Sequence, residues 1–210
     1  MEDILEIYES KPAEHVSRIC FDERPCQLIG DIYSPIPMTK NKVKKVDNEY
    51  TRNGTCVALL AYDIDTGKRF IKITDTRKKE DYTKFIDEIE RKHFKNVNKI
   101  ILIQDNLNTH KYGSFYENLS ITRASELRQK IEFHYTPIHA SWLNMAEIEF
   151  SSLSRQCLNR RIATKKEMIK EVAIWEKQRN KNKVKIAWSF TVTNARDKMA
   201  SKYHKVNSNY

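Results

Sequence analysis

The stretch that most constrains this chain is a short apolar run, Ile100 to Ile103, which stops at Gln104-Asp105-Asn106. The run is too short for a buried helix and is rich in β-branched residues. It therefore predicts a strand that is covered on both faces. Asp105 then stands at the carboxyl end of a strand, where open α/β sheets place their sites. An Asp in this position can also simply end the strand, by bonding its own backbone in a turn.

The same arrangement of a strand followed by an acid is predicted near the N-terminus. The apolar stretch from Val16 to Phe21 predicts a strand that ends at Asp22. Residues 31–53 are polar, contain two prolines and a basic run at 40–45, and predict an irregular excursion or a loose hairpin arm. Further strands are expected at 55–63, 69–74 and 131–135, the first two joined by a turn at 65–67.

Helical spacing of apolar residues predicts helices at 79–94, 114–118, 124–129, 141–159 and 164–179. Asp75 or Thr76 is the expected cap of the first of these helices and Ser141 of the fourth. Thr164, with Glu167 three residues later, forms a capping box for the last. The element order fits an α/β fold with a mixed five-stranded sheet and helices on both faces, as in the ribonuclease-H-like architecture. Connection rules would then bring Asp22 and Asp105 together.

The positive charge of the chain is concentrated near its C-terminus. Of 38 lysines and arginines and 28 acids, residues 151–210 hold 15 and 4, so residues 1–150 are close to neutral. This asymmetry predicts a polyanion partner, most simply nucleic acid. The alternative is a solvated basic helix face.

Composition excludes several classes of protein. No apolar run approaches the roughly 20 residues that span a bilayer, and the acidic N-terminus does not resemble a signal peptide. The four cysteines form no Cys-x-x-Cys pair, which indicates reduced thiols and no zinc site. We therefore expect a cytoplasmic, nucleoid-associated protein with no membrane partner.

Two acids at neighbouring strand ends repel each other unless a cation lies between them. Carboxylate oxygens suit Mg²⁺ or Mn²⁺, and a two-metal site needs a third acid. The helix expected after Ser141 offers Glu147 and Glu149. Two residues apart on a helix, they point in different directions, so only one can face the site. Periodicity alone does not choose between them.

A specific resemblance appears at 134–150, His-Tyr-Thr-Pro-Ile-His-Ala-Ser-Trp-Leu-Asn-Met-Ala-Glu-Ile-Glu-Phe. This segment resembles the third acidic block of insertion-sequence transposases of the mariner superfamily, which contains Leu-Asn-x-x-Glu. Phe21-Asp22-Glu23 resembles the first block, and Gln104-Asp105-Asn106 with the following residues to His110 resembles the second. The resemblance extends to Trp188-Ser-Phe190 and so covers nearly the whole chain.

The resemblance implies an Asp-Asp-Glu triad of Asp22, Asp105 and Glu147 that holds two Mg²⁺ or Mn²⁺ ions. It implies phosphodiester hydrolysis at the ends of a DNA element and transfer of the freed 3′-OH to target DNA. It also implies a homodimer or larger synaptic assembly on DNA. The spacing of 42 residues between Asp105 and Glu147 is longer than usual, and we expect the extra residues at 112–130.

Other side chains are candidates for supporting roles. Arg155, Arg160, Arg161, Lys165 and Lys166 are predicted to bind DNA phosphates, with a solvated helix face as the alternative. Asn106, His110, His139 and Asn144 are predicted to support the site, by orienting loops or carboxylates or by positioning phosphate or water. A purely structural role is the alternative for both histidines.

We expect three segments: a linker-like N-terminal segment at 1–15, a catalytic domain at 16–180 and a basic C-terminal extension at 181–210. Transposases of this kind carry N-terminal helix-turn-helix modules, and we expect none on this chain because only about 20 residues precede Asp22. Two other functions compete with an active transposase. One is a different ribonuclease-H-like nuclease, and the other is an inactive remnant that only binds DNA.

Overall fold

The centre of the protein is a five-stranded mixed sheet in the order β3-β2-β1-β4-β5, seen in a computed structural model that describes residues 1–200. The strands are β1 (Val16–Asp31), β2 (Tyr50–Asp63), β3 (Arg69–Thr74), β4 (Lys99–Gln104) and β5 (Ile131–Tyr135). β2 runs antiparallel to β1 and β3, whereas β4 runs parallel to β1 and β5 parallel to β4. The predicted sheet is therefore confirmed.

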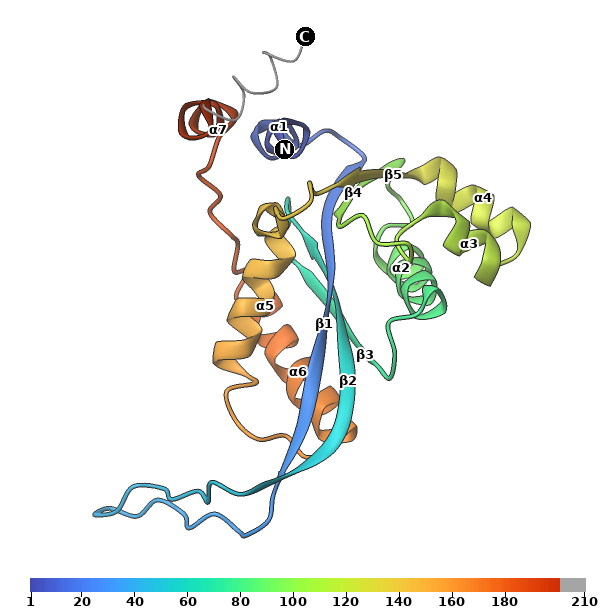
Figure 1. Ribbon diagram of the computed structural model, residues 1–210. Helices are drawn as coiled ribbons and strands as arrows, with labels where there is room; N and C mark the ends of the chain where they lie inside the picture. The colour runs from blue at the N-terminus through green and yellow to red at the C-terminus, as the bar shows by residue number, and fades with distance from the viewer. Residues whose placement is uncertain (201–210) are drawn as a thin grey trace.

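Helices cover both faces of the sheet (Figure 1). One face carries α5 (Met145–Gln156) and α6 (Lys165–Lys181); the other carries α2 (Lys79–His93), α3 (Tyr112–Asn118) and α4 (Ile121–Lys130). Successive strand residues face opposite sides, so Cys20 and Leu60 join the core under α5 while Phe21 and Leu59 join the core under α2. Within residues 1–200, no helix combines the length and hydrophobicity needed to cross a bilayer.

β1 is longer than the sequence suggested. We expected it to end before Asp22, but it continues through Asp22 and Pro25 to Asp31. The parallel pairing with β4 stops at Cys20, whereas the antiparallel pairing with β2 carries on to Asp31. Beyond Cys20, β1 thus has a neighbour on one side only, and a strand with a free edge tolerates a proline. Asp22 lies within a strand and not at its end.

The segment between β1 and β2 forms a hairpin arm, residues 32–49, that projects away from the domain (Figure 1). Isolated bridges join Ile36 to Lys45 and Thr39 to Lys42. This confirms the loose hairpin that was one of the two predicted forms. The arm exposes large apolar side chains at Ile36, Met38 and Val43 alongside its lysines.

Both terminal segments fold against the domain. We expected residues 1–15 to be linker-like, but α1 (Glu2–Glu9) buries Ile4 and Leu5 completely. Part of the expected basic extension forms a helix, α7 (Val192–Lys198), which packs beside α1 (Figure 1). Glu9 Oε1 accepts a 2.5 Å hydrogen bond from the Val192 amide. The rest of the predicted basic extension, 201–210, lies outside the described residues.

Two predicted helix caps are wrong and one is confirmed. Ser141 begins a 3-10 turn, Ser141–Leu143, and α5 starts after Asn144, whose side chain accepts from the Ala146 amide at 3.1 Å. At α2 neither Asp75 nor Thr76 is the cap: Lys78 is, and its amide donates to Asp81 at 3.1 Å. Thr164 does cap α6, accepting from the Glu167 amide at 3.2 Å as predicted.

Candidate active site

Asp22 and Asp105 come from neighbouring parallel strands. The pairing of β1 with β4 sets Cys20 opposite Ile103. Two residues further along each chain are Asp22, on the continuing β1, and Asp105, in the loop that follows β4. The register therefore carries both acids past the point where the two strands stop pairing, on the same edge of the parallel ladder.

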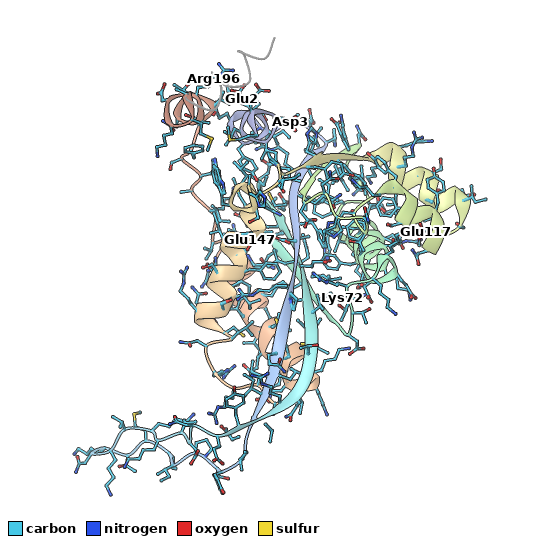
Figure 2. All side chains as sticks on the ribbon, in the orientation of Figure 1. Glu2, Asp3, Lys72, Glu117, Glu147 and Arg196 are labelled. Carbon is cyan, nitrogen blue, oxygen red and sulfur yellow. The ribbon has the colours of Figure 1, made fainter. Side chains whose placement is uncertain are left out.

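Glu147 lies in the first turn of α5, and a buried asparagine ties that turn to β1. Asn144 is 1% exposed, and its Nδ2 donates a 2.8 Å hydrogen bond to the carbonyl oxygen of Phe21, the residue before Asp22. The same side chain caps α5. One residue thus fixes the start of the helix against the strand that carries Asp22. Figure 2 shows Glu147 on α5 beside β1.

Burial and the negative charges of Glu147 and Asp105 affect the pKa of the Asp22 carboxylate. Burial raises its pKa to about 7, with further upward contributions from the negative charges of Glu147 and Asp105. The Glu23 amide, which donates to Asp22 Oδ1 at 2.8 Å, acts in the opposite direction. No lysine or arginine forms an ion pair with Asp22, Asp105 or Glu147 among residues 1–200. The three acids therefore concentrate negative charge that no lysine or arginine of the described chain neutralises, and His110, whose charge also lowers the pKa of Asp22, is the basic side chain that pairs with one of them, Asp105.

The chemistry of these donors fits a hard divalent cation, because carboxylate oxygens are the ligands that Mg²⁺ and Mn²⁺ prefer. No three His, Cys, Asp or Glu side chains within residues 1–200 are arranged closely enough to hold an ion as they stand. The side chains would have to draw together around a cation, and Glu147 and Asp105 are exposed enough to do so.

Glu149, the acid that the sequence left open beside Glu147, occupies a different environment. Its side chain is fully buried. Arg179 Nη2 donates to its Oε1 at 2.8 Å, and Arg69 Nε lies 3.0 Å from its Oε2 in an ion-pair contact. Arg69 is also fully buried and holds β3 against α6 through the Asn180 side chain. Glu149 is therefore an anchor of the core, with both its oxygens engaged by arginines.

A buried histidine links Asp105 to a further acid. His110 is fully buried, with its Nδ1 2.5 Å from Asp105 Oδ1 and its Nε2 3.4 Å from Glu23 Oε2. Burial favours the neutral ring, but the hydrogen bonds and negative charges of Asp105 and Glu23 outweigh it and raise the pKa of His110 to about 9. Sequence analysis assigned no role to Glu23. The signal was its place beside Asp22 on a strand, which turns the two side chains to opposite faces.

The remaining supporting candidates differ from one another. Asn106 is exposed and accepts a hydrogen bond from Lys111 Nζ within its own loop. His139 is exposed, has a φ of 62°, and forms no hydrogen bond or ion pair with any other described residue. The structure thus joins His110 and Asn144 to the candidate site and leaves Asn106 and His139 at its surface.

The predicted DNA-binding cations separate into engaged and free side chains. Arg161 donates to Asp31 Oδ1 at 2.7 Å and to three carbonyl oxygens at 47–49, so it holds the base of the hairpin arm. Arg160 pairs with Glu171, and Lys165 with Asp75 at 2.6 Å. Arg155 and Lys166 are exposed, and neither forms an ion pair with the described part of the chain.

Comparison with known proteins gives the same picture of the fold. The Mos1 mariner transposase in its paired-end complex with Mn superposes with a TM-score of 0.58 at 13% identity, over 87% of this chain and 54% of that one. The Mos1 strand transfer complex gives 0.55 at 13% identity, over 84% and 51%. This chain thus spans about half the length of those proteins. The likeness shows the fold alone, a ribonuclease-H-like mixed sheet with helices on both faces.

A search of curated proteins finds no match. The family described as DDE superfamily endonuclease matches residues 17–169, which include Asp22, Asp105 and Glu147. The match extends from the start of β1 into α6 and covers most of the chain. The chain therefore belongs to the DDE superfamily of endonucleases.

Proposed function

We propose that this protein is the catalytic domain of a DNA transposase. In this proposal it hydrolyses phosphodiester bonds at the ends of a DNA element and transfers the freed 3′-OH to target DNA. Asp22, Asp105 and Glu147 are the catalytic side chains. They hold two divalent cations, Mg²⁺ or Mn²⁺, and both the DNA and a second copy of the chain are partners.

The observation that carries the proposal is the group of acids around Asp22 that no lysine or arginine within residues 1–200 neutralises. The protein neutralises the buried acids Glu149 and Glu90 with its own arginines and lysine. Around Asp22 it leaves two further carboxylates and supplies no arginine or lysine, although burial makes such an arrangement costly. Such a cluster is stable when a cation completes it, and clusters of this kind are characteristic of functional sites.

The residues of the chain then have distinct tasks. Asp22 and Asp105 present oxygens from neighbouring strands, and Glu147 presents its oxygens from a helix whose start Asn144 holds against β1. The bound cations would activate water as a nucleophile and stabilise the leaving oxygen in an in-line displacement. Asn144 and His110 fix the backbone and side chains that carry the acids, so little reorganisation is left for the reaction itself.

Binding of DNA and of a second copy would use the exposed surfaces. Arg155 and Lys166 are free to contact phosphates, which position a duplex without reading its sequence. The lysines of the hairpin arm offer further contacts of the same kind. The apolar side chains exposed on the arm, Ile36, Met38 and Val43, suit a protein surface, because large exposed apolar groups commonly mark interaction sites. A synaptic assembly of two chains would supply one.

The test is divalent-metal-dependent nicking of a DNA end by the full chain. We compare wild type with Asp22→Asn, Asp105→Asn and Glu147→Gln, each of which removes one charge with little change of shape. Glu14→Gln is the matched control, because its carboxylate is 91% exposed and contacts His15 and none of the three acids. We expect nicking to need Mg²⁺ or Mn²⁺, to fall at least 10³-fold in the three variants, and to persist in the control.

Two alternatives give other results. DNA binding with no nicking and no metal dependence would indicate a catalytically inactive remnant. Nicking without joining of the 3′-OH to a second DNA would indicate a different ribonuclease-H-like nuclease. Nicking that survives in all three variants would remove the proposed acids from the reaction.

A further inference from the structure

Asp105 depends on a single side chain for its orientation. It lies in the loop after β4, is 38% exposed, and is followed by the exposed residues 106–108. Its only side-chain hydrogen bond within the described part of the chain is the 2.5 Å contact from Oδ1 to His110 Nδ1. A carboxylate on an exposed loop otherwise samples several rotamers, so His110 determines which oxygen it presents outward.

His110 is itself held on every side. Its ring lies edge-on to Phe21, with 5.2 Å between centroids, and tilted against Tyr82 at 4.8 Å. Its carbonyl oxygen accepts from Tyr135 Oη at 3.0 Å and from Gln104 Nε2 at 3.2 Å. Gln104 is in turn fixed by a 2.8 Å bond from Tyr82 Oη. The two aromatic rings thus contact the imidazole, and the two hydrogen bonds fix the backbone that carries it.

The far side of the ring meets Glu23. The Glu23 side chain is 3% exposed, its Oε2 lies 3.4 Å from His110 Nε2, and its Oε1 has no hydrogen-bond partner among the described residues. Arg77 approaches that oxygen only to 3.8 Å. A buried acid with one oxygen unpaired costs stability, so its retention beside the ring indicates a role in fixing the ring.

We propose that His110 is a positioning residue which, oriented by Glu23, holds Asp105 Oδ1 so that Asp105 Oδ2 is turned toward the divalent cation. This inference rests on the proposed function. It adds Glu23 and a defined geometry to the site. Groups that orient metal ligands in this way change metal affinity by about 10–100-fold when they are mutated.

Two substitutions of His110 distinguish the contact of its Nδ1 with Asp105 from the contact of its Nε2 with Glu23. In His110→Asn the amide nitrogen can occupy the place of Nδ1 and keep the bond to Asp105. In His110→Gln it can occupy the place of Nε2, which keeps the contact with Glu23 and loses that to Asp105. We measure Mn²⁺ binding to the full chain by calorimetry, with no DNA present. We also measure the thermal midpoint of each variant and the Mn²⁺ concentration that gives half-maximal nicking.

We expect His110→Gln to weaken Mn²⁺ binding at least tenfold and His110→Asn to weaken it much less, at similar thermal midpoints. His134→Gln is the matched control. His134 also lies between two acids, with Asp3 at 2.8 Å and Glu132 at 3.0 Å, but on β5. It should leave Mn²⁺ affinity unchanged. If both His110 variants lost the same Mn²⁺ affinity, and their thermal midpoints fell equally, His110 would be a purely structural histidine and the proposal would be overturned.

Glu23→Gln keeps the inference testable if His110→Gln does not fold. The amide retains the size of the side chain and an oxygen that can accept from His110 Nε2. We expect a smaller loss of Mn²⁺ affinity at an unchanged thermal midpoint, and unchanged affinity would overturn the role of Glu23. Wild-type protein that neither binds Mn²⁺ nor nicks DNA would instead defeat the proposed function, so the two failures are distinct.

Discussion

Two carboxylates on α5, only two residues apart, stand in opposite electrostatic surroundings. Glu149 belongs to what we call the arginine cluster, in which Arg69 and Arg179 engage both its oxygens and solvent is excluded. Glu147 belongs to the acidic cluster, with Asp22 and Asp105, where no lysine or arginine of the described residues forms an ion pair. The helix period turns the two acids to different sides of α5. Arg69 of β3 then contacts Glu149, whereas Asp22 of β1 belongs to the cluster of Glu147.

The difference distinguishes an acid that maintains the fold from an acid that is available for chemistry. In the arginine cluster the charges balance, and the cost of burying them is offset by direct contacts. In the acidic cluster the pKa of Asp22 is raised, first by burial and then by the negative charges of Glu147 and Asp105. A chain that folds with such a cluster loses stability there unless an external cation relieves the repulsion.

The largest expected effect comes from breaking the arginine cluster. Glu149→Gln leaves Arg69 buried without a full counter-charge, and loss of one partner of a buried ion pair destabilises a protein by about 3–5 kcal/mol. Glu147→Gln removes a repulsive charge from a more exposed position, so the free energy of unfolding should be unchanged or slightly higher. Chemical denaturation of both variants without metal measures the contrast. If Glu147→Gln were the more destabilising change, the distinction between the clusters would be wrong.

An intermediate effect is expected from pH and metal at the acidic cluster. The pKa of Asp22 is about 7 in the folded protein against an ordinary 3.8. Between these values the folded state keeps a proton that the unfolded state has released, so metal-free stability falls as pH rises from about 4 to about 7. Above pH 7, Mn²⁺ at 100 times its dissociation constant should raise the free energy of unfolding by about 2.7 kcal/mol.

Asp22→Asn is the variant that isolates the contribution of Asp22 to the pH dependence of stability. The pKa of Glu176 is also raised to about 7 by burial, and His110 contributes a loss of stability as pH rises toward 9, but both groups titrate in either protein. The difference between wild type and Asp22→Asn in thermal midpoint, measured from pH 4 to pH 8, therefore reports Asp22. A difference that stays constant with pH would show that Asp22 ionises normally and would remove the contrast between the clusters.

The sequence predicted the elements of the sheet better than their ends. Short β-branched runs such as Ile100–Ile103 have few alternatives to a buried strand. β4 extends that run by one residue at each end, and β3 and β5 were placed correctly to the residue. The end of β1 was missed because Asp22 and Pro25 resemble a turn in isolation. Only the long pairing with β2, a tertiary contact, keeps them in the strand. The burial of α1 was missed for the same reason, since its partner α7 lies at the other end of the chain.

The sequence could propose the three acids of the candidate site, but not the side-chain contacts around them. The blocks around Asp22, Asp105 and Glu147 are continuous in sequence, so the resemblance could find them. The choice between Glu147 and Glu149 needed the resemblance, because a helical period does not say where Arg69 and Arg179 will lie. The bridge from Asp105 through His110 to Glu23 spans 87 residues between its last two members. No local pattern encodes such a contact.

The smallest expected effects concern the cations of the C-terminal third, where the contrast between engaged and free charge recurs. Lys166 is free to neutralise a phosphate, so Lys166→Ala should lower the slope of log binding constant against log salt by about 1. Arg161 is already engaged at the base of the hairpin arm, so Arg161→Ala should lower the thermal midpoint and leave the slope unchanged. DNA binding measured from 50 to 200 mM salt gives both slopes. If the slope fell in Arg161→Ala and stayed unchanged in Lys166→Ala, the ion pairs of the free protein would not predict which side chains contact DNA phosphates.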